Sequence, residues 1–146
     1  MSEIDKSEVM SYILHELVDM SSRKTTKEHA FLTMSSLLKK FQNKYDFLKH
    51  VEINDTRYLE FYDPVTVMTD IDTVKSHDLG VALRDIIITM NSDLGKDAGH
   101  FFIKELRNNL DDEYHSTIEE MGVDLGLMQL EFEVNEMGRR LRTENK

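Results

Sequence analysis

The chain of 146 residues contains no cysteine, no tryptophan and a single proline. Without cysteine it can form neither a disulfide bond nor a thiolate metal site, and it has no thiol nucleophile. No apolar run approaches the ~18 residues that a membrane-spanning helix needs, and the first residues lack the apolar core of a secretory signal. We therefore expect a soluble, cytoplasmic protein that does not bind membranes.

The motifs of common catalytic and cofactor sites are also missing. The sequence has no phosphate-binding loop, no dinucleotide-binding glycine fingerprint, no nucleophile elbow, no His-Glu-x-x-His pair and no calcium-binding loop. Its formal net charge is −10, which disfavours attraction to nucleic acid. No cofactor is therefore indicated by motif, and no nucleic-acid partner is expected.

Charge is unevenly distributed along this acidic chain. Lysine and arginine dominate residues 23–49, whereas aspartate and glutamate dominate residues 105–136. The first interpretation is that these two segments neutralise each other, within one chain or between two copies. The second is that the basic segment binds an anionic ligand. We favour the first, because interspersed surface charge is the common case.

Apolar residues at helical spacing predict five helices. They cover residues 7–20, 28–48, 74–90, 96–114 and 116–142, and the Thr-Thr-Lys-Glu sequence at residues 25–28 offers a capping box for the second helix. Two overlapping capping boxes starting at Ser116 and Thr117 begin the fifth. A chain of this length is typical of one domain, so we expect residues 1–146 to form a single helical bundle.

The pattern changes between the second and third helices. Val51 and Ile53 alternate with polar residues, β-prone residues follow, and the sole proline, Pro64, would interrupt a helix. A small β-hairpin or a long extended crossover around residues 51–72 explains this pattern equally well. The predicted fold is therefore mainly all-α, a four- to five-helix bundle with that hairpin or crossover.

The C-terminal helix carries two apolar stripes on nearly opposite sides. Such a helix is either the central helix of the bundle or one whose second face meets another subunit. One stripe consists of Val123, Leu127, Leu130, Val134, Met137 and Leu141. The other, which we predict to be the interface, consists of Met121, Leu125, Met128 and Phe132.

Two glycines interrupt the same predicted helix. Gly122 and Gly126 are four residues apart, and each costs a helix ~1 kcal/mol relative to alanine. The close approach of a neighbouring helix is the simplest explanation for this spacing. A ligand lying against the exposed backbone is the alternative.

Metal ligands deserve consideration because helical bundles often hold metals. A di-iron bundle uses Glu-x-x-His pairs, which this sequence lacks. It has two Asp-x-x-His pairs, Asp97 with His100 and Asp112 with His115. These pairs are about 15 residues apart, or about 22 Å along a helix, so they cannot share one ion. We therefore expect solvated polar residues here, with a metal site as the weaker interpretation.

Two functional hypotheses follow from these patterns. The first is a non-enzymatic interaction or regulatory module that acts through an apolar helix face and self-associates as a homodimer or binds another protein. The alternative is a helical-bundle ligand- or metal-binding protein, or an enzyme, that uses acidic and histidine residues near helix ends. The sequence names no substrate, reaction or partner.

Overall fold

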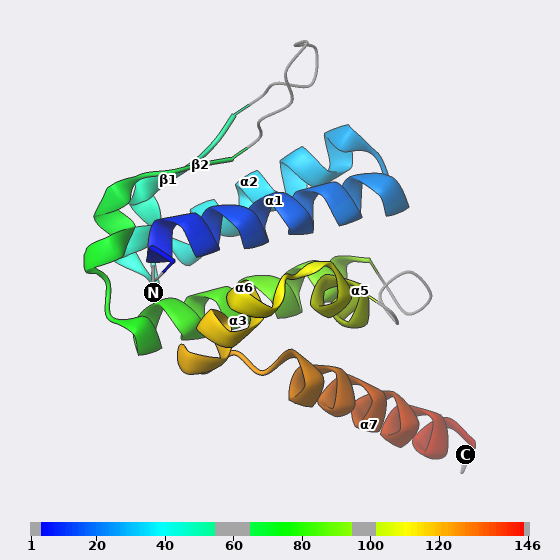
Figure 1. Ribbon diagram of the computed structural model, residues 1–146. Helices are drawn as coiled ribbons and strands as arrows, with labels where there is room; N and C mark the ends of the chain where they lie inside the picture. The colour runs from blue at the N-terminus through cyan, green and yellow to red at the C-terminus, as the bar shows by residue number, and fades with distance from the viewer. Residues whose placement is uncertain (1–3, 55–64, 95–101, 145–146) are drawn as a thin grey trace.

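The computed structural model describes residues 4–54, 65–94 and 102–144, with backbone alone at residues 136 and 139–144. The described part is mainly helical, as predicted (Figure 1). Its α-helices are α1 (Lys6–Lys24), α2 (Lys27–Phe41), α3 (Ser76–Asp93), α5 (Phe102–Asn109), α6 (Asp112–Glu120) and α7 (Leu125–Glu144). Two 3₁₀ helices, η1 (Asp46–His50) and η2 (Thr69–Thr73), flank the strands.

The segment around residues 51–72 contains a hairpin. Strands β1 (Val51–Ile53) and β2 (Val65–Val67) pair in antiparallel fashion, with Val51 opposite Val67. An isolated two-stranded ribbon is marginal in water, and this one is stabilised by packing because Val51 and Val65 are buried and β2 contacts α1. The hairpin alternative is thus confirmed, whereas Pro64 lies outside the described residues.

The central helix is α1, so the first of the two alternatives for the C-terminal helix, that it is the central helix of the bundle, is wrong. Helix α1 contacts α2, α3, α5, α6, β2 and η2, and Figure 1 shows it between α2 and the layer formed by α3, α5 and α6. The reason lies in its composition, since it presents apolar residues over about half of its circumference. Its buried residues are Val9, Met10, Ile13, Leu14, Leu17, Val18, Met20 and Ser21.

Two adjacent threonines separate α1 from α2. The Thr25 hydroxyl donates to the Ser21 carbonyl at the end of α1. The Thr26 hydroxyl accepts from the His29 amide and caps α2. The cap of α2 is therefore Thr26, and the helix ends at Phe41, earlier than the predicted residue 48.

Helix α3 approaches another part of the backbone closely at Gly80. A Cβ atom at this position would lie 1.9 Å from the carbonyl oxygen of Met121, which no side chain could tolerate without movement. Gly80 therefore permits the contact between α3 and the residue that follows α6. Here glycine allows two backbone segments to lie close together. The sequence pattern did not single out this position.

The prediction of one continuous helix over residues 116–142 is wrong, because the chain turns between α6 and α7. Gly122 has a φ of +96°, a left-handed conformation that favours glycine. The Gly122 amide donates to the Glu119 carbonyl and the Val123 amide to the Ile118 carbonyl, which is the Schellman pattern of helix termination. Asp124 then caps α7, since its Oδ1 accepts from the Leu127 amide at 3.0 Å.

The predicted boundary between the fourth and fifth helices is also shifted. Helix α5 ends at Asn109 and α6 begins at Asp112, so the described part of the predicted 96–114 helix is interrupted at residues 110–111. Ser116 is an interior residue of α6 and not a cap. The Thr117 hydroxyl donates to the Glu113 carbonyl four residues earlier. This is a bond inside α6, so Thr117 does not cap a helix either.

Candidate protein-interaction surface

One face of α7 packs against the rest of the chain. Leu125 and Met128 are buried and Phe132 is half-buried, while α7 contacts α5. An ion pair between Arg84 of α3 and Glu131, with 3.3 Å between Nη2 and Oε2, joins α7 to a second helix. We call the side of α7 that carries Leu125, Met128 and Phe132 its inner face.

The interface residues named from the sequence lie on this inner face or just before it. Met121 is buried in the turn after α6, where its carbonyl oxygen meets α3 at Gly80. With Leu125 and Met128 it belongs to the hydrophobic core. This stripe is therefore covered by the chain itself, because the turn at Gly122 swings α7 back onto α5.

The opposite face of α7 is exposed and apolar. Its side chains, which we call the outer stripe, recur at alternating spacings of three and four residues, the pattern of helices that pair along a seam. More than half of the surface of each side chain is open to solvent. The residues and their exposed fractions are Leu127 (51%), Leu130 (55%), Val134 (57%) and Met137 (61%).

Large exposed apolar residues elsewhere in the described ranges do not form such a stripe. They are Leu32 on α2, Met68 beside β2, and Val81 and Ile88 on α3. Single exposed apolar residues are normal on protein surfaces, whereas a contiguous row marks an interaction site more often. The outer stripe is therefore the distinctive apolar surface among the residues that the structure describes.

Helix α7 lies at the edge of the molecule. Figure 1 shows it below the layer of α3, α5 and α6, with its carboxyl end pointing away from the other helices. Beyond Phe132, the described side chains of Glu133, Val134, Asn135 and Met137 are all exposed. These four side chains therefore pack little against the rest of the chain.

The two glycines predicted to allow close approach have different surroundings. A Cβ atom at Gly122 would meet nothing within 4 Å, so this glycine is explained by its positive φ and not by crowding. A Cβ atom at Gly126 would lie 3.4 Å from Asp124 Oδ1 and 3.6 Å from Arg107 Nη1, which are ordinary contacts. Neither position requires a ligand to account for glycine.

Of the residues proposed as weak metal ligands, only Asp112 and His115 lie in the described part of the chain, and these two are not part of an assembled metal site. Asp97 and His100 lie outside the described residues. Asp112 is exposed in the first turn of α6, and His115 Nδ1 lies 3.4 Å from Glu119 Oε1. In residues 4–54, 65–94 and 102–144, no three histidine, aspartate or glutamate side chains are placed to hold one metal ion.

The basic and acidic segments do meet within the chain. Arg23 Nη1 lies 3.3 Å from Glu105 Oε1, and Lys24 Nζ lies 3.1 Å from Glu105 Oε2. These pairs join the end of α1 to α5, as the interpretation of local neutralisation predicts. They are partly exposed and therefore contribute little to stability.

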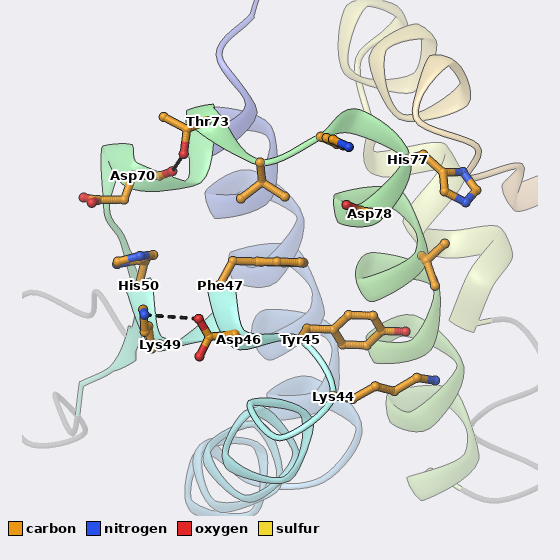
Figure 2. Close-up of a pocket in the computed structure, with 13 residues that line it drawn as sticks. Lys44, Tyr45, Asp46, Phe47, Lys49, His50, Asp70, Thr73, His77 and Asp78 are labelled. Atoms are coloured by element: carbon orange, nitrogen blue, oxygen red, sulfur yellow. Dashed lines mark hydrogen bonds and ion pairs between the residues drawn. The ribbon is translucent and has the colours of Figure 1, made fainter.

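A polar groove of about 610 Å³ lies between η1, η2 and the start of α3 (Figure 2). Figure 2 shows Phe47 between the η1–η2 side and α3, with His50 and Asp70 on one side and His77 and Asp78 on the other. The groove is lined by Lys44, Tyr45, Asp46, Phe47, Lys49, His50, Asp70, Thr73, Val74, Lys75, His77, Asp78 and Val81.

Charge in this groove is balanced. Lys44 Nζ pairs with Asp85 Oδ2 and Lys49 Nζ with Asp46 Oδ2, each at 3.1 Å. The Tyr45 hydroxyl also donates to Asp85, and burial, followed by this hydrogen bond, raises the pKa of Tyr45 above its ordinary value. Two of the three lysines are thus already paired with aspartate. The groove does not gather the unpaired positive charge that an anion site needs.

A second, smaller hollow involves an aromatic pair that the sequence pattern did not reveal. The rings of Tyr12 and Tyr114 stack with their centroids 4.4 Å apart. The Tyr12 hydroxyl donates to the Asn109 carbonyl and the Tyr114 hydroxyl to Glu8. Each hydroxyl is therefore occupied, and the pair connects α1 to α5 and α6. We interpret it as a structural contact and not as a ligand site.

Comparisons with protein-family models, with curated proteins and with solved structures returned no match. Among the described helices, none combines the length and the apolar character needed to cross a membrane. The functional interpretation therefore depends on the geometry of the surfaces alone.

Proposed function

We propose that this protein is a non-enzymatic interaction module that self-associates through the outer stripe of α7. The observation that supports this proposal is the row of four apolar side chains, each more than half exposed, on a helix whose opposite face is already buried. A bifacial helix of this kind has one face for its own core and one for a partner. The proposal keeps the two-stripe hypothesis but exchanges the roles of the two stripes.

The energy available from this surface is sufficient for association. Fully burying a leucine, valine or methionine side chain is worth roughly 1.5–3 kcal/mol, and the outer stripe offers four such side chains per copy that are already partly buried. Association costs entropy, so only part of this gain becomes affinity. A reversible homodimer is the expected result.

The alternative of a ligand-binding protein or enzyme has weaker support. Its best location is the groove lined by Phe47 and His77, where paired charges leave little to attract an ion. The outer stripe, by contrast, exposes apolar surface at a cost that association removes. We therefore favour the interaction module.

The test is the mass of the protein in solution. Light scattering or sedimentation over a wide range of protein concentration should show reversible association of the unmodified chain. Leu130→Asp should weaken it by about tenfold or more, because burying an unpaired carboxylate costs more than the ~1.4 kcal/mol that a tenfold change represents. The matched control is Leu32→Asp, at a leucine with 53% exposure against 55% for Leu130.

Circular dichroism should show both variants folded, which separates association from unfolding. The proposal predicts that Leu32→Asp associates like the unmodified protein. A chain that stays monomeric at the highest concentrations, or two variants that behave alike, would contradict self-association through the outer stripe.

A further inference from the structure

We propose that α7 is a hinged arm, which opens away from the rest of the protein about a joint at residues 122–124 while the other helices stay folded. This inference goes beyond the proposed self-association and does not depend on it. Three features support the hinge: the capping of the two helix ends at the joint, the distribution of contacts along α7, and the organisation of the core around α1.

The joint lies between two helix ends that are each capped by their own residues. The Gly122 and Val123 amides donate to carbonyls in the last turn of α6. The Asp124 side chain caps α7, and the Asp124 carbonyl accepts from the Met128 amide at 3.0 Å. A rotation of the backbone between Val123 and Asp124 breaks none of these hydrogen bonds, so both helix ends stay satisfied when α7 moves. Hinges are commonly built from a few residues at the ends of elements.

The contacts that hold α7 closed are concentrated in residues 125–132. Leu125 and Met128 are buried and Phe132 is half-buried, on the side of α7 that meets α5. The side chains of the Arg84–Glu131 ion pair are both about half exposed, and such a pair contributes little to stability. The carboxyl end of the helix points away from the other helices (Figure 1). Opening the arm therefore takes few apolar side chains out of the core.

The larger part of the core is organised around α1. This helix contacts α2, α3, α5 and α6, and its own apolar side chains are buried along its whole length. Proteins open in cooperative units, and each unit opens at a free energy that follows the contacts it breaks. Releasing α7 breaks a small set of contacts, whereas releasing α1 breaks the core. The arm should therefore open at a lower free energy than global unfolding.

The hinge controls which apolar surfaces of α7 a partner can reach. In the closed state the outer stripe is exposed, while Leu125 and Met128 are covered by the chain itself. Opening adds the inner face to the outer stripe and uncovers the surface of α5 on which α7 lies. The open arm thus presents both apolar stripes of the helix, and the closed arm presents one.

Native-state hydrogen exchange tests the hinge, because an isolated helix of this length is marginal in water and an opened arm exchanges its amides. The measurement is made on Leu130→Asp, in which the proposed self-association is weakened and cannot protect α7. The amides of α7 should share one opening that is less protected than that of the α1 amides. Low concentrations of urea should accelerate exchange in α1 more steeply than in α7, since opening the arm exposes less surface.

A conservative substitution in the core distinguishes arm opening from global unfolding. Ile13→Val, at a fully buried residue of α1, should accelerate exchange of the α1 amides about two- to tenfold. It should leave the α7 amides unchanged, because opening the arm does not break the contacts of Ile13. Met128→Ala, at a buried residue of the inner face, should accelerate the α7 amides about tenfold or more.

Two results would overturn the hinge. If Ile13→Val accelerates α7 and α1 by the same factor, α7 opens only when the whole molecule unfolds. If Met128→Ala leaves exchange in α7 unchanged, its amides exchange without release of the inner face. Either result leaves self-association intact where light scattering shows a dimer. If the unmodified chain is instead a monomer, Leu130→Asp is a surface substitution and the exchange measurement still tests the hinge.

Discussion

At Gly122 the backbone adopts a φ of +96°, and this angle determines where α6 ends and in which direction α7 leaves. An L-residue with a side chain pays ~1–2 kcal/mol to occupy the left-handed region. The surroundings add nothing to this cost, because a Cβ atom here would meet open space. Gly122 is thus a purely conformational requirement, whereas Gly80 is a steric one.

Gly80, Gly122 and Gly126 should therefore respond differently to alanine. Gly122→Ala should lower the free energy of unfolding by about 1–2 kcal/mol through backbone strain. Gly80→Ala should lower it more, since its Cβ would lie 1.9 Å from the Met121 carbonyl oxygen. Gly126→Ala should be neutral or stabilising by up to ~1 kcal/mol, because the residue is helical and has room. Urea denaturation measures the free energy of unfolding of all three variants. If Gly122→Ala were as stable as the unmodified protein, the left-handed conformation at Gly122 would be contradicted.

Glu16 on α1 gives a pH-dependent prediction. Burial, followed by the negative charge of Asp19, raises the pKa of this carboxyl above its ordinary value of 4.5. Between the unfolded and folded pKa values the folded state therefore binds more protons, and stability falls as the pH rises through that window. Ionised Glu16 consequently costs stability at neutral pH.

Glu16→Gln should remove this cost. The amide oxygen of glutamine can still accept from Asn109 Nδ2, which donates to Glu16 Oε2 at 3.3 Å. We expect the variant to be more stable than the unmodified protein at pH 7, with the difference shrinking as the pH falls through that window and lost below 4.5, the ordinary value. Chemical denaturation across this pH range measures it. A difference that does not change with pH would show that the carboxyl charge is not the cause.

At the scale of elements, the sequence predicted the helices well where periodicity and capping chemistry coincide. Most ends of helices α1, α2 and α3 lie within a few residues of the predicted ends. The hairpin strands include Val51 and Ile53, which alternate with polar residues. These elements are specified locally, by apolar spacing and by polar caps such as Thr26. Local specification is what a single sequence can reveal.

The break between α6 and α7 escaped prediction because the apolar periodicity continues across it. Val123 and Leu125 keep the spacing of both stripes, although they lie after the turn. A local signal did exist, namely a glycine followed two residues later by Asp124, the order of a helix stop and a helix cap. Competing capping signals around Ser116 obscured it.

The assignment of the two stripes to core and surface depended on tertiary structure. Both stripes contain apolar side chains at the same spacing, so the sequence could not tell which of them meets α5. The structure buries Leu125 and Met128 and exposes Leu130 and Val134. The existence of a bifacial C-terminal helix was thus predictable, whereas the identity of its exposed face was not.

At the scale of the whole molecule, the layers around α1 form most of the core, to which α7 adds Leu125 and Met128. Helix α1 contacts α2, α3, α5 and α6, whereas α7 makes its main contact with α5. The body is therefore stabilised within one chain, and the outer stripe adds stability only when a partner covers it. Self-association should consequently act as ligand binding does, by favouring the folded state through mass action.

This linkage makes the melting temperature depend on protein concentration. For a folded dimer that unfolds to two monomers, each tenfold increase in concentration stabilises each chain by about 0.7 kcal/mol, or roughly 2–3 °C at this size. Calorimetry of the unmodified protein and of Leu32→Asp should show this rise, whereas the melting temperature of Leu130→Asp should stay constant in the range where it is monomeric. If the unmodified protein dimerises but melts at a constant temperature, the dimer contact contributes nothing to the folded state, and the outer stripe cannot be the surface that holds it together.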